Sequence, residues 1–344
     1  PDPDDVINQA SMEFFVGFRP QQGPLILDGS VCAGCHTLIT QTLDLAGTPT
    51  GDDFVEQATW HEWKNSIYGS DPDKTCRDCH MPRIQDSVIL ASEYVFLPGH
   101  SPYGLHHLAG GNAFMLKLLK EHQDALGIPA TDAQFDSTIA RTLRNLQGKS
   151  VQFDLTLAGR TLDTAYIDAD LINLTGHKFP SGYPSRRAFV QLVVTDAEGD
   201  TLFQSGRWDG TYEVFGHDAT YEPHYDVITD GDQVQIYEMV MGDVNGDVTT
   251  VLERAKDPIK DDRLVPQGFS TTHPAYDTTL IAGVPTNDID FNRDAFGTEG
   301  NGGDRVHYHV PMGGYTGMIH AHASVWYQPV PPKWRTTRPS STAK

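Results

Sequence analysis

The sequence has no uninterrupted apolar stretch of about eighteen residues, the length that a membrane-spanning helix needs. We therefore expect no transmembrane span. Basic residues are scarce, with 25 Lys and Arg against 46 Asp and Glu, and the formal charge is −21. Nucleic acid is excluded as an expected partner, because phosphate contacts need clustered Lys and Arg. The acidity predicts a well-solvated surface, or attraction to a cationic partner or a mineral surface.

Cysteine is also scarce, with four residues in the whole chain. All four lie in two C-x-x-C-H runs, Cys32–His36 and Cys76–His80, whose first cysteines are 44 positions apart. No thiol therefore remains for a disulfide or for nucleophilic catalysis.

The C-x-x-C-H spacing places two sulfurs on one side of a helical turn, where they can bond the two vinyl groups of a porphyrin. The histidine that follows presents its imidazole to the iron. A four-thiolate zinc site does not require this histidine, and the βαβ context of a redox pair is absent. We predict two covalently bound haem c groups. They are attached through Cys32, Cys35, Cys76 and Cys79, with His36 and His80 as proximal iron ligands.

Haem c is attached outside the cytoplasm, so the motifs predict an extracytoplasmic protein, either periplasmic or extracellular. The chain opens on Pro1. Because a chain cannot be initiated at proline, we expect a mature, processed N-terminus.

The sixth iron ligands must come from the remaining histidines, of which the chain has 15 in total. Methionine ligation would raise the reduction potential, but none of the seven methionines has a compelling setting. Met81 follows His80 too closely to cross the porphyrin ring. We therefore predict bis-histidine ligation.

The first part of the chain reads as helices and loops. Residues 1–30 are expected to form an arm with little regular structure, and residues 98–111 a loop. The expected helices cover residues 52–68, 112–126 and 131–146, with Gly127 and Thr131 as end signals. His61, on the first of these helices, either faces a haem edge or fills an amphipathic face.

The pattern changes near residue 148 to the alternation of half-buried strands. The expected strands are Val151–Leu157, Ala165–Leu174, Ala188–Asp196, Gln233–Val240, Val306–Val310 and Ala321–Gln328. Turns rich in Gly and Asp separate them, which favours an antiparallel β-sandwich. We predict an α+β protein with a dihaem domain and N-terminal arm over 1–148, a β-sandwich over 149–334, and an extended tail over 335–344.

Four stretches resemble a family of secreted multihaem c-type cytochromes in which a β-sandwich follows the haem segment. They are Glu62–Ser66 leading to Cys76–Pro82, His106–Asn112, Thr175–Arg187, and Met241–Phe269 with its Lys260–Arg263 run. The Thr175–Arg187 stretch is the most specific. Members of this family often carry more haems, so two attachment sites are a departure, which leaves open where electrons enter and leave.

The resemblance implies distal ligand roles for His177 and His106, with His107 as an alternative to His106. The residues around His177 support this independently, because Gly176 and a turn with Pro180 place it on a constrained loop. Such a loop can reach from the sandwich to the haem segment. The guanidinium groups of Arg186 and Arg187 either bind haem propionates or form ordinary surface ion pairs.

Two further patterns have competing interpretations. Asp243–Asp247 resembles half of a calcium loop, but Glu253 does not complete the twelve-residue pattern, so a tight turn is favoured. The acidic segment Asp288–Asp304 has the same ambiguity. His320 and His322 share one face of a strand, where they either bind a metal or an intersubunit haem, or are surface residues.

The function expected from these features is electron transfer between redox partner proteins or to extracellular acceptors. Two imidazole ligands per iron leave no coordination position for a substrate. A variant of this hypothesis is a subunit that self-assembles into a polymeric extracellular haem chain. The enzyme alternative is a dihaem peroxidase, whose two helical domains and widely spaced motifs differ from this chain. A haem-anchored binding module is a third class, because a sandwich supports many functions.

Overall fold

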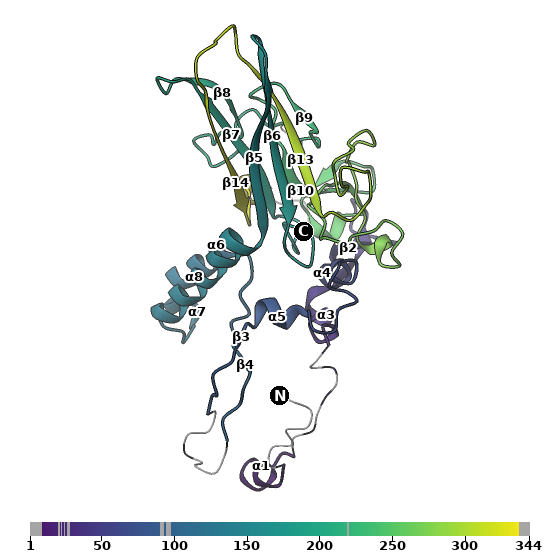
Figure 1. Cartoon of the computed structure of the whole chain (residues 1–344). Coiled ribbons are helices and arrows are strands. Elements are labelled where there is room, and N and C mark those ends of the chain that lie inside the picture. The colour runs from purple at the N-terminus through teal and green to yellow at the C-terminus, as the bar shows by residue number, and fades with distance from the viewer. Residues whose placement is uncertain are drawn as a thin grey trace. The chain divides into compact units, whose positions relative to one another are not determined.

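The computed structural model describes residues 9–19, 21, 23, 25, 28–89, 93, 98–218 and 220–336 (Figure 1). The chain forms two compact units, one of Pro1–Gly34 with Asp71–Asn145 and one of Cys35–Ser70 with Leu146–Lys344. The second unit resumes close to the boundary expected near residue 148, and it also takes in residues 35–70, which differs from the expected division. Among the described residues, the helices lack the combination of length and apolar character that crossing a bilayer requires.

The first unit is built from helices and two very short strands. Its elements are α1 (Gln9–Val16), the start of α3 (Ser30–His36), α5 (Cys76–His80), β3 (Arg83–Ile84), β4 (Tyr103–Gly104), α6 (Ala113–Glu121), α7 (Gln123–Leu126) and most of α8 (Asp132–Lys149). Helix α1 supplies eight helical residues in the arm that was expected to have little regular structure. Residues 1–8, and positions 20, 22, 24, 26 and 27, lie outside the described residues.

The two helices expected near residues 112–146 are confirmed, with their end signals. The side chain of Asn112 accepts a hydrogen bond from the Met115 N–H at 2.9 Å and caps α6. Gly127 ends α7 in the left-handed region with φ +63°. The helix expected over residues 112–126 is interrupted at His122 and forms two helices, α6 and α7. Phe135 and Ile139 supply the buried face of α8.

The prediction of a helix over residues 52–68 is correct only for residues 59–64. Residues Pro49–Gln57 form strand β2, which pairs antiparallel with β1 (Leu38–Leu43), and only Thr59–Lys64 forms a helix, α4. The turn that closes this hairpin is stabilised by the Asp44 carboxylate, which accepts hydrogen bonds from the N–H groups of Ala46 and Thr48. Cross-strand pairing and the burial of Phe54, 3% exposed, override the local helical pattern.

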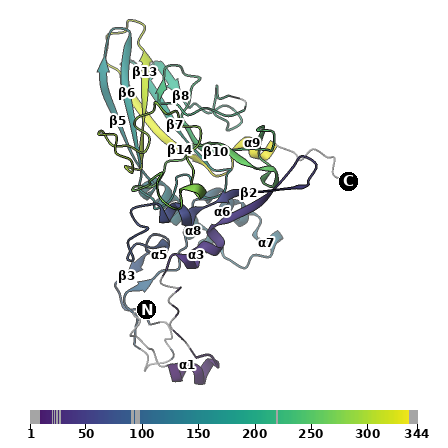
Figure 2. The same ribbon diagram turned by 90° about the vertical axis from the view of Figure 1, so that its right-hand side faces the viewer.

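The second unit contains two larger sheets, whose order confirms the expected α+β fold with an antiparallel sandwich. One sheet has the order β11-β10-β7-β14, with β12 beside β10 and β8 beside β7, and the other has the order β5-β6-β13-β9. Figure 2 labels β7, β8, β10 and β14 of the first sheet and β5, β6 and β13 of the second. Only the pairing of β13 with β9 is parallel among these strands. The strands are β5 (Val151–Arg160), β6 (Thr164–Asn173), β7 (Arg187–Thr195), β8 (Thr201–Ser205), β9 (Val227–Ile228), β10 (Ile236–Gly242), β11 (Val248–Thr249), β12 (Asp257–Asp261), β13 (Gly303–Pro311) and β14 (His320–Gln328). All six expected strands are therefore confirmed.

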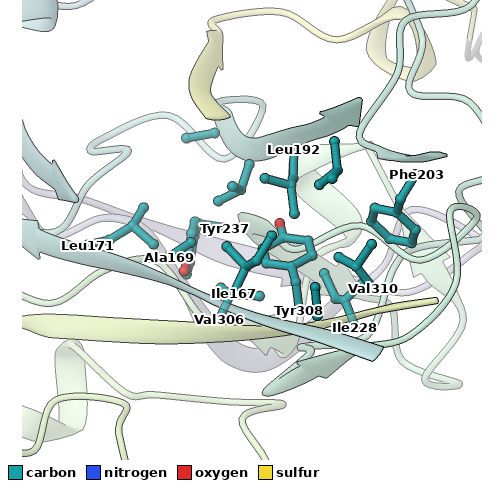
Figure 3. Close-up of a cluster of buried hydrophobic side chains, with 14 of the residues drawn as sticks. Ile167, Ala169, Leu171, Leu192, Phe203, Ile228, Tyr237, Val306, Tyr308 and Val310 are labelled. Carbon is teal, nitrogen blue, oxygen red and sulfur yellow. The ribbon is translucent and has the colours of Figure 1, made fainter. Parts of the chain in front are cut away.

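The inner faces of the two sheets meet in one apolar core. Ile167 and Leu171 of β6 alternate with less buried residues, and Leu192 of β7 and Tyr237 of β10 reach the same cluster from the other sheet (Figure 3). A fully buried Leu or Ile side chain contributes about 1.5–3 kcal/mol relative to an exposed one. The alternation of apolar and polar residues in the sequence therefore corresponds to side chains that point alternately into the core and away from it.

The hairpin between β10 and β11 explains the calcium-like run. The Asp243 carboxylate accepts hydrogen bonds from the N–H groups of Asn245 at 2.8 Å and Asp247 at 3.1 Å, and Gly246 has φ +81°. These are the contacts of a tight turn between paired strands. The tight-turn interpretation of Asp243–Asp247 is confirmed.

Candidate haem site

Both C-x-x-C-H runs fold as short helices, which is the backbone geometry that porphyrin attachment requires. In α3, the Ser30 N–H donates to the Asp28 carboxylate at 2.9 Å. In α5, the Thr75 N–H donates to Oδ2 of Asp78 at 2.8 Å, and Asp78 also provides negative charge in the first turn. The helices place the two cysteines of each run, which are three positions apart, within about one turn, and the histidine directly follows the second cysteine.

The four cysteines form no disulfide, and Cys35 and Cys79 are exposed. The first cysteines of the two runs are neighbours in the first unit. The carbonyl oxygen of Gly29 accepts from the Cys32 N–H at 3.0 Å and lies 4.0 Å from Sγ of Cys76. Burial raises the pKa of the Cys76 thiol to about 11, and the Cys32 thiol beside it adds to the rise. The fold therefore brings the first cysteines of the two runs together.

The imidazole of His80 is oriented by a backbone carbonyl. Its Nδ1 lies 2.8 Å from the carbonyl oxygen of Ala109, and the Leu108 N–H donates to the carbonyl oxygen of His80 at 2.9 Å. A carbonyl partner at Nδ1 favours the tautomer with a proton there, in which Nε2 carries the lone pair. Metal-ligating histidines are held in this way. The surroundings of His80 fit a proximal iron ligand.

The segment that contacts His80 also carries both candidate distal histidines of the first unit. His106 is exposed, with its ring centroid 6.2 Å from that of Tyr103. His107 is half-buried, and burial, together with the charges of Arg141 and Arg144, lowers the pKa of its imidazole. A lowered pKa favours the neutral form that binds iron. Both residues remain candidates.

His177 lies in the second unit, on the loop that follows β6. Its Nδ1 is 2.9 Å from the carbonyl oxygen of Lys178, the same kind of contact that orients His80. A Cβ at Gly176 would lie 3.1 Å from the Tyr68 ring and 3.2 Å from the Trp63 ring, so a larger residue at this position would force one of these rings to move. His36, on α3, belongs to this unit as well.

A buried network of four charged side chains lies beside the His177 loop. Lys178 Nζ pairs with Asp261 at 2.8 Å, and Arg263 pairs with Asp261 at 2.7 Å and with Glu62 at 3.3 Å. Three of the stretches that carry the family resemblance therefore meet here: Glu62–Ser66, Thr175–Arg187 and the Lys260–Arg263 run.

The network is electrically balanced, with two cations and two carboxylates. Burial lowers the pKa of the Lys178 ammonium. Burial raises the pKa of Asp261, but the charges of Arg263 and Lys178 outweigh it and hold that pKa below its usual value. Removing one partner of a buried pair costs about 3–5 kcal/mol, because an uncompensated charge is left behind. The network thus holds its segments in one arrangement.

The two candidate propionate ligands lie in different surroundings. Arg187 is 1% exposed, its Nε donates to the Gln328 side chain at 2.7 Å, and its guanidinium pairs with Glu213. Nη1 of Arg186 donates to the carbonyl oxygen of Ser181 at 2.7 Å. The buried ion pair of Arg187 with Glu213 stabilises the sandwich. Propionate binding by Arg186 and Arg187 stays a prediction.

Three other histidines singled out in the sequence are dispersed. His61 lies on α4, where burial lowers the pKa of its imidazole and its buried Nδ1 has no hydrogen-bond partner among the described residues. His320 and His322 lie on β14 and are exposed, and Nε2 of His322 is 3.4 Å from Oγ of Ser324.

Sequence reasoning missed two histidines that are surrounded by carboxylates. Fully buried His224 lies between Asp262, at 3.0 Å, and Asp288, at 2.8 Å. His307 lies between Asp168, at 2.7 Å, and Asp290, at 3.0 Å. The partners are distant in sequence, so no local spacing reveals them. The ambiguous acidic segment Asp288–Asp304 supplies part of both clusters.

Comparison with known proteins gives one distant structural similarity. No family model and no curated protein matches the chain. It is similar to the crystal structure of a penta-haem cytochrome c552 from Thermochromatium tepidum, with 18% sequence identity over 90% of this chain and a TM-score of 0.45. The chain spans about half the length of that protein, of which 50% is covered.

Proposed function

We propose that this protein is a dihaem c-type cytochrome that transfers electrons between extracytoplasmic redox partners or to extracellular acceptors. The observation that carries the proposal is the pair of C-x-x-C-H runs, which use every cysteine of the chain and fold as short helices. Haem c, when bound, supplies a one-electron iron couple. The residues of this chain supply its attachment, its axial ligands and its electrostatic surroundings.

In this proposal His36 and His80 are the proximal ligands, and His177 with His106 or His107 are the distal ligands. The carbonyl contacts of His80 and His177 support these roles, because each favours a lone pair on Nε2. Each iron would then be held by two imidazoles. Such a centre exchanges electrons but offers no position to a substrate, which favours electron transfer over peroxidase chemistry.

Production of the protein with a cytochrome c maturation system tests the proposal. We expect a mass increase equal to two haem groups, and a low-spin bis-imidazole spectrum in both oxidation states. The variants Cys35→Ala and Cys79→Ala probe each attachment site separately. A protein without covalent haem contradicts the proposal, and a high-spin centre with hydrogen peroxide turnover favours the peroxidase alternative.

A polymeric haem chain is a second candidate, and an exposed aromatic segment favours it. Phe14 is 82% exposed and Phe18 is 79% exposed, both at or just after α1. Apolar side chains gathered on a surface often mark a protein–protein contact. Electron microscopy at high protein concentration is expected to show filaments, which the double change Phe14→Ser and Phe18→Ser abolishes. Discrete particles for the unchanged protein contradict this candidate.

A further inference from the structure

The peptide group that joins His177 to Lys178 is held at both of its ends by buried side chains. Nδ2 of Asn173 donates to the carbonyl oxygen of His177 at 2.8 Å. The N–H of Lys178 donates to Oε2 of Glu62 at 3.0 Å. Because a peptide group is rigid and planar, contacts at its two opposite ends fix its orientation.

The two side chains come from distant parts of the second unit, and neither reaches solvent. Asn173 ends β6 and is 0% exposed, while Glu62 lies on α4 and is 1% exposed. Their own remaining polar atoms are engaged as well. Asn173 also donates to the carbonyl oxygen of Leu264 at 2.8 Å and accepts from the Thr175 N–H at 2.8 Å. Arg263 balances the charge of Glu62 at 3.3 Å.

The orientation of this peptide group fixes the His177 imidazole. The peptide group determines the direction of the backbone after His177 and thereby the position of Lys178. The carbonyl oxygen of Lys178 lies 2.9 Å from Nδ1 of the His177 imidazole. A buried carboxylate is costly to retain unless it has a function or a complete set of partners. One partner of the Glu62 carboxylate is the N–H of Lys178, the residue that follows the candidate ligand His177.

We propose that Asn173 and Glu62 are positioning residues that hold the His177 imidazole in place for a haem iron. The proposal rests on the ligand role of His177 proposed above. Neither side chain acts on the iron directly, since both hold the backbone of His177 and Lys178. We call the two contacts of Asn173 and Glu62 with the 177–178 peptide group the clamp. Without the clamp, the imidazole would sample other positions, and part of the molecules would lose His177 as a ligand.

The variant Asn173→Ala, studied in the haem-loaded protein, provides the first test. We expect the loss of up to half of the low-spin signal, corresponding to one of two haems, and its recovery when imidazole is added. The matched control is Asn65→Ala. Asn65 is also buried and also makes two hydrogen bonds to a distant segment, both with Ser270 at 3.0 Å, but it does not contact the 177–178 peptide group. The control is expected to lower the melting temperature with an unchanged spectrum.

The variants Glu62→Ala and Glu62→Gln test the other end of the peptide group. Glutamine retains an oxygen that accepts from the Lys178 N–H, so Glu62→Gln is expected to keep more of the low-spin signal than Glu62→Ala. Glu238→Gln serves as the control for loss of a buried carboxylate, since Glu238 is 3% exposed and pairs with Lys333. These variants also decide the question if Asn173→Ala yields no folded protein.

The variant His177→Ala separates the two proposals. If His177→Ala creates a high-spin haem while the Asn173 and Glu62 variants remain fully low-spin, the clamp is overturned and the ligand role stands. If His177→Ala leaves the spectrum unchanged, the ligand assignment is overturned and the clamp falls with it. A high-spin haem in His177→Ala, in Asn173→Ala and in Glu62→Ala supports the clamp.

Discussion

The Nδ1 atom of His80 lies 2.8 Å from the carbonyl oxygen of Ala109, which connects the second C-x-x-C-H helix to a segment 29 positions later in the chain. The contact joins a candidate proximal ligand to the segment that carries two candidate distal ligands. The ring of His80 is therefore oriented by the same loop that presents His106 and His107, within one unit.

Comparison of His106→Ala with His107→Ala identifies the distal ligand of this segment. We expect His106→Ala to convert one haem to the high-spin form, because the family resemblance implies that role for His106. His107→Ala is expected to leave the spectrum low-spin. Low-temperature electron paramagnetic resonance distinguishes the two states. The reverse result assigns the ligand to His107, and two unchanged spectra contradict both assignments.

The stability of the protein is expected to fall as the pH rises from about 6.5 to 10, because of His224. Burial alone lowers the pKa of this imidazole, but its hydrogen bonds to Asp262 and Asp288 prevail and raise the pKa to about 10. Since the folded pKa exceeds the unfolded one, the stabilisation is complete below about pH 6.5 and is lost as the pH rises through about 10.

Urea denaturation at several pH values measures this dependence. The variant His224→Gln is expected to weaken the pH dependence and to destabilise the protein by about 3–5 kcal/mol, since buried carboxylates lose their cationic partner. His322→Gln, at an exposed position of β14, is the control and should retain the full dependence. An equal pH dependence in His224→Gln and the unchanged protein would show that His224 is not its source.

The sandwich core is expected to respond strongly to loss of side-chain volume. Leu192 of β7 is 0% exposed and lies in the cluster between the two sheets (Figure 3). Leu192→Ala removes buried methyl groups and leaves a cavity, which costs about 2–5 kcal/mol of unfolding free energy. Leu157→Ala, at a position of β5 that is 56% exposed, should change it by less than about 0.5 kcal/mol. Similar losses in both variants would contradict this description of the core.

The net charge of −21 predicts a difference between cationic and anionic redox reagents. Stopped-flow measurements are expected to give faster electron exchange with a cationic reagent at low salt. That rate should fall several-fold when the ionic strength rises to about 0.15 M, because salt screens long-range attraction. The rate with an anionic reagent should rise under the same conditions. Rates that are insensitive to salt would show that the surface charge lies away from the sites of electron exchange.

Local sequence patterns predicted the parts of the fold that are determined locally. The alternation in residues 165–174 gave β6, because one face of that strand lies on the core. Gly127 and Thr131 marked helix ends through their own backbone and hydrogen-bonding preferences. The strand β2 was missed, because its pairing with β1 is a tertiary contact that the helical pattern of residues 52–57 conceals.

The same limit applies to the candidate site. The haem-attachment residues are adjacent in sequence, so their spacing revealed them. The clamp on the His177–Lys178 peptide group needs Glu62, which lies 116 positions from Lys178. The Lys260–Arg263 run carried a family resemblance, but its contact with Glu62 depends on the folded arrangement. Neither contact has a signature that one sequence can display.

The position of residues 35–70 within the second unit has a consequence for the order of folding. Asn65 bonds to Ser270, 205 positions later, and Glu62 bonds to Lys178, so these contacts need sequence that the ribosome makes much later. This segment therefore waits for the carboxyl-terminal half of the chain before it reaches its final arrangement. A nascent chain stopped before residue 270 lacks the partner of Asn65, so this segment completes its contacts only after residue 270 has been made.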